Sequence, residues 1–271
     1  MPGPGASPAR LLVLTTVLLP ATITCPESRA GTSIPDEARR MGVGVSGMWE
    51  SHTGLLLLDY YEAFLKDRDL GEFRDRVSAR YTEATLGRVL SASPSAAARR
   101  AAVLALGVMG SFAQSNAVLA RALRDTDPVV RAMADSALWT IWFRADSPEN
   151  NRTLQEVRLL IGNQQIDEAV ELAGRLIASA PRFAEAFNQR AIARFIQGRF
   201  AESAEDCQRV LQLNPYHFGA LSGLAQCQLQ TGKPREALQT LRRLLKLQPY
   251  SPSIRQSIQE LEAQIEPDGP R

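Results

Sequence analysis

Three stretches with similar endings decide the fold: LIASAP at residues 176–181, VLQLNP at 210–215 and LLKLQP at 244–249. Their closing prolines, Pro181, Pro215 and Pro249, lie 34 residues apart. A fixed interval of this length indicates stacked helix–turn–helix units, because a single unit cannot bury its apolar face alone. The sequence therefore predicts a repeat array over residues 148–249.

Two further positions recur at the same interval. Twelve residues before each proline stands a small side chain, where the two helices of a unit must approach closely: Ala169, Ser203 and Ala237. Seventeen residues before each proline we expect the turn between the helices, where glycine permits a positive φ: Gln164, Gly198 and Gly232. Gln164 makes the first unit the least regular.

This pattern resembles the tetratricopeptide repeat family. The matching positions are Ala169, Leu176, Pro181, Phe187, Ala191, Gly198, Phe200, Val210, Pro215, Leu224, Ala225, Gly232, Ala237, Leu244 and Pro249. The sequence departs from the family at Arg190 and Arg194, where apolar or aromatic residues are usual, and at Cys207, which replaces a large aromatic. The resemblance implies an all-α fold, a right-handed α-solenoid of stacked helical hairpins, whose first helices line a groove for a partner peptide.

The family register also assigns the residues of that groove. They are Asn151, Leu154, Arg158 and Ile161 in the first unit, Glu185, Asn188, Ile192 and Phe195 in the second, and Ser222, Gln226 and Leu229 in the third. This mixture suits a peptide, with polar groups for its backbone and apolar ones for its side chains. Chaperone-docking relatives hold a C-terminal carboxylate with a basic set, and the matching positions here are Leu154, Arg158, Gln189, Gly219 and Gly223. Only Arg158 is basic, so we expect no carboxylate clamp.

A fainter repeat precedes the first one. Arg99, Ala102, Ala105 and Leu106 return 32 residues later as Arg131, Ala134, Ala137 and Leu138. The wording DTDPVVRAMADSAL (125–138) resembles the HEAT-like family, in which a proline begins the first helix and an arginine reaches an aspartate in the adjacent loop. This resemblance predicts HEAT-like helices over about residues 84–144. Trp139 and Trp142 at its end are expected to pack one array against the next, with ligand stacking as the alternative.

Two helices are expected before these repeats. Leu57, Tyr61, Phe64 and Leu65 form one apolar stripe of the first helix. The second is predicted from Glu72 to Leu90, with a buried side that consists of Phe73, Val77, Tyr81 and Ala84.

The first 41 residues differ in composition from the rest. LLVLTTVLL (11–19) is too short to span a bilayer and resembles the apolar core of a secretory signal, with cleavage after Ala21. The alternative is a disordered leader ahead of a chain that starts at Met41 or Met48. A cytoplasmic location is favoured, and export follows if residues 1–21 are a signal.

The composition argues against several classes of function. The chain has 31 Lys and Arg against 29 Asp and Glu, without the strongly basic segment that binding to nucleic acid requires. Three cysteines, Cys25, Cys207 and Cys227, and two histidines, His52 and His217, form no metal or nucleophile motif. Cys207 and Cys227 are expected to be small buried side chains rather than a redox pair. We therefore expect no metal, no cofactor and no nucleic acid.

The sequence thus predicts four parts: a leader (1–41), a HEAT-like region (42–146), three tetratricopeptide units (147–251), and a capping helix with a tail (252–271). The favoured function is a non-enzymatic scaffold that binds a protein or peptide partner. The alternatives are an accessory subunit of an enzyme or a HEAT-like lyase, and an envelope-associated scaffold if the leader is a signal. Membrane association is not expected unless the leader stays uncleaved.

Overall fold

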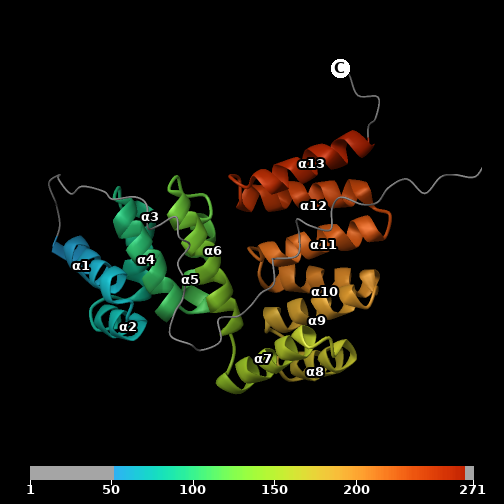
Figure 1. Cartoon of the computed structure of the whole chain (residues 1–271), viewed down its shortest axis with the longest axis horizontal. Coiled ribbons are helices and arrows are strands. Elements are labelled where there is room, and N and C mark those ends of the chain that lie inside the picture. Colours follow the sequence, from blue (N-terminus) through green and yellow to red (C-terminus); the bar gives the residue numbers. More distant parts are fainter. Residues whose placement is uncertain (1–51, 266–271) are drawn as a thin grey trace, which may run out of the picture.

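A computed structural model describes residues 52–265. This part of the chain contains thirteen α-helices packed as stacked hairpins, which confirms the all-α fold (Figure 1). The helices are α1 (His52–Asp67), α2 (Leu70–Ser78), α3 (Glu83–Ala92), α4 (Ala96–Met109), α5 (Phe112–Ala122), α6 (Pro128–Phe143), α7 (Pro148–Gly162), α8 (Ile166–Ser179), α9 (Ala184–Ile196), α10 (Phe200–Leu213), α11 (Phe218–Gln230), α12 (Pro234–Leu247) and α13 (Pro252–Ile265).

The helices form two arrays, here called the N-terminal array (α1–α6) and the C-terminal array (α7–α13). In the C-terminal array each helix contacts the next one along the chain, and α9 also contacts α7 and α11. Figure 1 shows these helices stacked in order, with α6 running along one side of the stack, where it faces the ends of several helices. The predictions about the leader, including Cys25, Met41 and Met48, lie outside the described residues.

The segment from Glu72 to Leu90 is not the single helix that its apolar spacing predicts. It divides into α2 and α3, because Thr82 caps the start of α3: its Oγ1 accepts a hydrogen bond from the Thr85 amide, with 3.2 Å between the atoms. The new start changes the helical phase, so Ala84, expected to be buried, is exposed.

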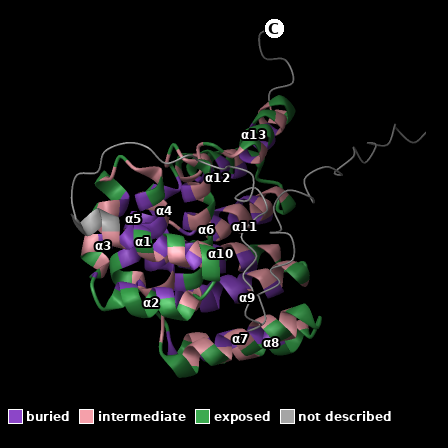
Figure 2. Ribbon diagram, turned by 60° about the vertical axis from the view of Figure 1, so that its left-hand side comes forward, coloured by how far each residue is buried: buried purple, intermediate pink, exposed green. Residues whose placement is uncertain are grey.

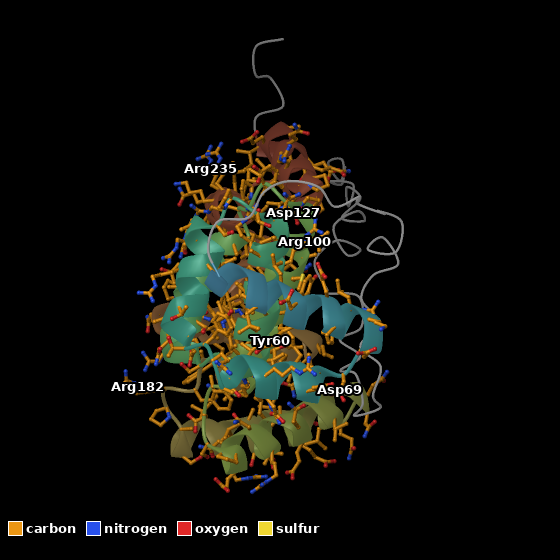
Figure 3. All side chains as sticks on the ribbon, turned by 90° about the vertical axis from the view of Figure 1, so that its left-hand side faces the viewer. Tyr60, Asp69, Arg100, Asp127, Arg182 and Arg235 are labelled. Carbon is orange, nitrogen blue, oxygen red and sulfur yellow. The ribbon has the colours of Figure 1, made fainter. Side chains whose placement is uncertain are left out.

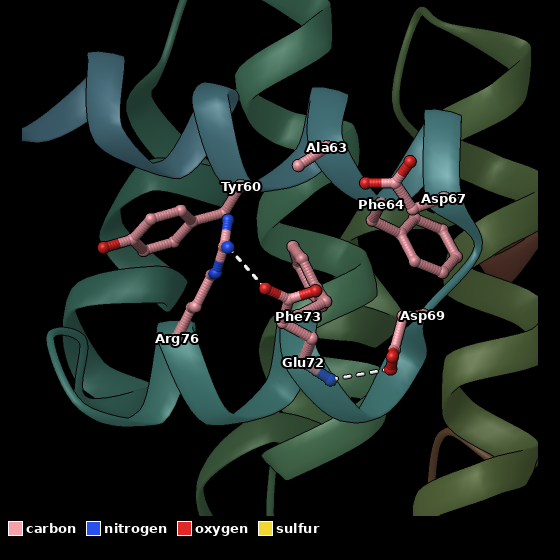
Figure 4. A pocket seen from close by; sticks show the side chains of 8 residues that line it. All are labelled: Tyr60, Ala63, Phe64, Asp67, Asp69, Glu72, Phe73 and Arg76. Carbon is pink, nitrogen blue, oxygen red and sulfur yellow. Dashed lines mark hydrogen bonds and ion pairs between the residues drawn. The ribbon is translucent and has the colours of Figure 1, made fainter.

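The remaining predictions for this region hold. Leu57, Tyr61 and Phe64 of α1 and Phe73, Val77 and Tyr81 of the following segment are buried. Figure 4 shows the contact between α1 and α2, where Asp69 caps α2 by accepting from the Glu72 amide at 2.8 Å. Arg76 pairs with the Glu72 carboxylate and lies over the Tyr60 ring.

The 32-residue repeat of the N-terminal array is visible in its contacts. Arg99 Nη1 donates to the carbonyls of Ser93 and Pro94, and Arg131 Nη1 donates to those of Asp125 and Thr126, six and five residues before it in both cases. Each arginine therefore closes the loop that precedes its own helix.

Aspartates then join consecutive units of this array. The Arg99 guanidinium binds both carboxylate oxygens of Asp125 in the next loop, at 2.7 and 2.8 Å. The neighbouring Arg100 binds Asp127 in the same two-pronged way, and Figure 3 shows these two side chains together. This guanidinium lowers the pKa of the Asp127 carboxyl. The predicted contact between an arginine and an aspartate in the adjacent loop is present. Arg99 makes it with the Asp125 carboxylate, whereas Arg131 donates to backbone carbonyls.

The 34-residue repeat of the C-terminal array rests on backbone geometry. Gln164, Gly198 and Gly232 have φ values of 61°, 75° and 73°, so all three predicted turns adopt the left-handed conformation. Gln164 adopts this conformation although it has a side chain, so its backbone is strained. The small residues Ala169, Ser203 and Ala237 are at most 2% exposed at the helix crossings, as the sequence predicts.

The second unit contains an ion cluster inside its hairpin. Asp206 of α10 accepts from Arg190 Nε and Nη2 and from Arg194 Nη1, at distances of 2.7 to 2.9 Å. The Asp206 side chain is only 4% exposed. One buried carboxylate thus pairs with both of the arginines that depart from the family pattern, although Arg194 Nε remains buried without a hydrogen-bond partner.

Buried residues line the helix faces that point toward one another, and the outer faces are exposed (Figure 2). The largest apolar cluster extends from α1 through Trp142 of α6 into α11, α12 and α13, so the two arrays share one core. At the far end, Ile254, Ile258 and Leu261 of α13 are buried. This helix covers the last apolar face of the stack, as predicted for a capping helix.

Candidate protein-binding groove

The predicted groove residues lie on α7, α9 and α11, and their exposure divides them into two groups. Partly exposed are Asn151, Arg158, Ile161, Ile192, Phe195, Ser222, Gln226 and Leu229. Buried are Leu154, Glu185 and Asn188, at 0%, 1% and 4% exposure. The buried residues come from the first halves of α7 and α9, where Asn151 is the one predicted position that stays partly exposed.

Leu154 is buried by the end of α6. It belongs to an apolar cluster with Leu176, Ala180 and Phe183, and Phe143 and Ala145 pack against this cluster. The first turn between repeats, around Ala180 to Phe183, is therefore covered by the residues that lead from the N-terminal array into α7.

Glu185 and Asn188 are buried in a hydrogen-bond network rather than facing a partner. The Glu185 carboxylate accepts from Asn188 Nδ2 at 2.8 Å and from Gln189 Nε2 at 2.7 Å. Its other oxygen lies 2.9 Å from His217 Nε2. Because His217 Nδ1 accepts from the Ala220 amide at 3.0 Å, Nε2 is the nitrogen that donates to Glu185. This network links α9 to the start of α11.

The second turn between repeats is covered by aromatic residues of α6. Trp142 stacks on the His217 ring, with 4.2 Å between centroids and an interplanar angle of 19°. Trp142 Nε1 donates to Asn116 Oδ1 at 2.8 Å, and Asn116 Nδ2 donates to Asn214 Oδ1 at 2.9 Å. A buried polar chain thus connects α5, α6 and the turn at Asn214.

Trp139 makes a second contact at this turn. It meets His217 and Phe218 edge to face, at 5.3 Å in both cases. A Cβ atom on Gly219 would lie 2.7 Å from Trp139 Cη2, so any larger residue here would require the Trp139 ring to move. The sequence prediction that Trp139 and Trp142 pack one array on the next is borne out by these contacts.

The third turn is reached from the start of α6. The Arg131 guanidinium lies over the Tyr250 ring, 4.2 Å from its centroid. Along its length α6 therefore contacts the third, second and first turns of the C-terminal array in succession. We call this set of contacts the α6 junction.

Apolar side chains remain accessible on the second half of α9. Ile192 and Phe195 are partly exposed on α9, and Ile196 is 53% exposed. Ile196 is not among the groove residues predicted from the sequence, although it lies four residues after Ile192 and directly follows Phe195. Arg158 stands at one side, 4.3 Å from the Phe143 centroid, and donates to Gln155 Oε1 at 2.7 Å. We call these four residues, together with Gln226 and Leu229 of α11, the open groove.

The positions of a carboxylate clamp offer no basic set. Leu154 and Gln189 are buried, and Gln189 donates to Glu185. Gly219 faces Trp139, and Gly223 lies against Cys207. Arg158 is the one basic residue of the five.

One acidic side chain on α6 stands apart from these networks. Within residues 52–265, Oδ2 of Asp135 is buried without a hydrogen-bond partner. Burial raises the pKa of this carboxyl to about 6. Asp135 lies one turn from both Arg131 and Trp139, and Val103 occupies the equivalent place in the preceding 32-residue unit.

Two classes of site have no representative in the described part of the chain. Between residues 52 and 265, no three His, Cys, Asp or Glu side chains converge as a metal would require. No helix of that range combines the length and hydropathy needed to cross a membrane.

Comparisons with known families match the C-terminal array. Two family models, both described as tetratricopeptide repeat, match residues 154–218 and 194–261. A TPR repeat-containing protein of Rhizobium etli is 28% identical over 138 residues, which span 51% of this chain and 68% of that protein. Sperm-associated antigen 1 of Mus musculus is 30% identical over 104 residues, but these make up only 11% of its length.

Two solved structures match the chain at low similarity. The first TPR domain of Spaghetti, bound to an HSP90 peptide, has a TM-score of 0.42 and 21% identity, and the match covers 44% of this chain and 95% of that one. The TPR2AB domain of yeast Sti1, in complex with an HSP90 peptide, has a TM-score of 0.39 and 16% identity, with 77% and 96% covered. The two tetratricopeptide repeat models together match residues 154–261 and do not extend to the N-terminal array.

Proposed function

We propose that this chain is a non-catalytic scaffold that binds a segment of another protein in the open groove. The observation that carries the proposal is an apolar group on the second half of α9, formed by the half-buried Ile192 and Phe195 and the exposed Ile196. Arg158 is partly exposed on the neighbouring helix α7. An exposed apolar patch with polar residues around it is typical of a protein-interaction site.

The partner is a short segment with aliphatic or aromatic side chains for the centre and polar groups for Arg158 and Gln226. Because α6 covers part of α7 and α9, the surface left for the segment is smaller than a complete groove. An affinity of roughly 1 μM, about 8 kcal/mol, is expected for so small a surface. The HSP90 peptide of the two solved structures is not proposed as the ligand, because the clamp positions here supply a single arginine.

We further propose that about residues 84–144 form HEAT-like repeats. The support is the 32-residue interval at which Arg99 and Arg131 make the same pair of contacts to backbone carbonyls. Their place in the function is to hold α6 against the C-terminal array.

The test is affinity capture from native extract with the wild-type chain and the double variant Arg158→Ala/Ile196→Asp. The proteins retained are identified by mass spectrometry, and the Kd of the purified partner is measured by calorimetry. The double variant is expected to lose at least tenfold in affinity, which is about 1.4 kcal/mol. Asn188 is unsuitable for this test because it is buried, and its replacement would disturb the fold.

Leu159→Asp is the matched control. Leu159 is 65% exposed on α7 and lies outside the open groove, so this variant makes the same apolar-to-acidic change at another surface. If the control loses the partner and the groove variant keeps it, the proposed site is wrong.

A further inference from the structure

Two cysteines that the sequence separates by twenty positions meet in the C-terminal array. Cys207 of α10 is 2% exposed and Cys227 of α11 is 0% exposed. Cys207 Sγ faces Gly223, one turn before Cys227 on α11, and Cys227 Sγ faces Ser203, one turn before Cys207 on α10, so the two thiols are neighbours where these helices meet. Cys227 Sγ also lies 3.3 Å from Ser203 Oγ, which in turn donates to the Ala191 carbonyl at 2.7 Å.

A glycine allows this approach. A Cβ atom on Gly223, one turn before Cys227, would lie 3.2 Å from Cys207 Sγ. The sulfur of Cys207 therefore rests against the α11 helix at a place where no side chain intervenes. Cys207 also stands where the tetratricopeptide pattern usually has a large aromatic, and the small thiol at this position lets α10 and α11 lie close together.

The two thiols are electrostatically unequal. The neighbouring Cys207 thiol lowers the pKa of the Cys227 thiol. The neighbouring Cys227 thiol, together with burial, raises the pKa of the Cys207 thiol. Cys227 is thus the sulfur that ionises first, and a thiolate is the form that reacts with an oxidant.

We propose that Cys207 and Cys227 form a redox-modification site, which hydrogen peroxide converts into a disulfide that links α10 to α11. The Cys227 thiolate attacks one peroxide oxygen, and the O–O bond breaks to give a sulfenic acid and hydroxide. The Cys207 sulfur then attacks the Cys227 sulfur and loses its proton, and the S–O bond breaks to release water. The two thiols are oxidised by two electrons, and one peroxide is reduced to two waters.

The link joins the second repeat to the third. Within the described residues, α10 and α11 are held together by packing and hydrogen bonds, so a covalent bond restricts their separation. Because both thiols are buried, peroxide reaches them only when this part of the array opens locally. Oxidation is therefore expected to be slow in buffer and faster in urea concentrations below the unfolding transition.

The test uses the full chain with Cys25→Ser, so that these two thiols are the only ones present. After treatment with hydrogen peroxide, the intact mass is expected to fall by about 2 Da, and both thiols should disappear from a titration under denaturing conditions. A proteolytic digest should contain a peptide that joins the two cysteines. The Tm should rise by roughly 5 °C, and dithiothreitol should reverse all these changes.

The further variant Cys227→Ser is the control, and it should show no 2 Da loss and no rise in Tm after peroxide. The proposal is overturned if the chain that retains both cysteines gains oxygen mass without a cross-linked peptide. It is also overturned if both thiols stay titratable while free glutathione in the same solution is oxidised. Since these two results come from the chain with both cysteines intact, they hold even if the serine variant misfolds.

Discussion

The two arrays join successive helical units with different groups. In the N-terminal array, arginine side chains close the loops and bind aspartates of the next loop, as Arg99 does with Asp125. In the C-terminal array, a left-handed residue ends the first helix of each hairpin and a small side chain stands at the crossing, as at Gly198 and Ser203. This difference explains why the 34-residue repeat of the C-terminal array is easier to detect in the sequence than the 32-residue repeat of the N-terminal array. Backbone geometry restricts residue type at fixed positions, whereas a side-chain contact can be made in several ways.

The largest effect on stability is expected from a substitution that separates the two arrays. Trp142→Ala removes a buried ring that stacks on His217 and leaves the Asn116 carbonyl without its donor. We expect a loss of about 4 kcal/mol and two resolved transitions in urea, followed by circular dichroism. Thr140→Ala changes an exposed residue of the same helix and should unfold as the wild type does. A single transition at the wild-type midpoint for Trp142→Ala would show that the α6 junction does not couple the arrays.

A second comparison lies within the N-terminal array. Arg99→Ala leaves the partly buried Asp125 carboxylate without its two-pronged partner, and we expect a cost of about 3 kcal/mol in the free energy of unfolding. Arg131→Ala loses bonds to carbonyls and the contact with Tyr250, for about 1 kcal/mol. Denaturation of both variants at one pH measures the difference. The reverse order would contradict the view that links between loops hold this array together.

Asp135 gives the α6 junction a pH dependence. Its pKa is raised to about 6 in the folded chain, so the protonated form is the one that folding favours. The stability contributed by protonation is fully present below the unfolded pKa near 4 and is lost as the pH rises through about 6. Asp135→Asn should therefore stabilise the chain by about 2 kcal/mol at pH 8 and change little at pH 4. Urea denaturation at the two pH values measures this, and an equal effect at both would count against the assignment.

The smallest effect is expected at the irregular turn. Gln164 has a φ of 61°, a conformation in which glycine carries no steric cost. Gln164→Gly should raise the free energy of unfolding by about 1 kcal/mol, and Gly198→Gln, its mirror change in the second repeat, should lower it by a similar amount. Thermal unfolding of the pair is the measurement. If both substitutions lower the free energy of unfolding, the Gln164 side chain makes a stabilising contribution that outweighs its backbone strain.

The sequence predicts the parts of the fold that depend on residue type at fixed spacing. The prolines, the small residues at the crossings and two of the three turn residues identify the C-terminal array, and the two tryptophans identify its contact with the N-terminal one. The single helix from Glu72 to Leu90 is wrong because its apolar spacing hides a helix start at Thr82, where a threonine stands before an acidic residue.

The groove is predicted less well, because its exposure depends on which surface α6 covers. Leu154, Glu185 and Asn188 occupy groove positions by register and are nevertheless buried. The hydrogen bond between Asn116 and Asn214 joins residues 98 positions apart, and no local sequence pattern predicts it. Likewise, Arg190 and Arg194 look like departures from the repeat until Asp206 is found between them.

The α6 junction also has a mechanical consequence. In an ordinary solenoid each repeat contacts only its neighbours, so a pulling force at the two ends extends the stack gradually, as it would a spring. Here one rigid helix touches the first, second and third turns, and it resists the sliding of one repeat past the next. Under load the C-terminal array should stay stiff until α6 detaches, and only then lengthen. A protein tethered through this segment would transmit tension with little stretch below that threshold.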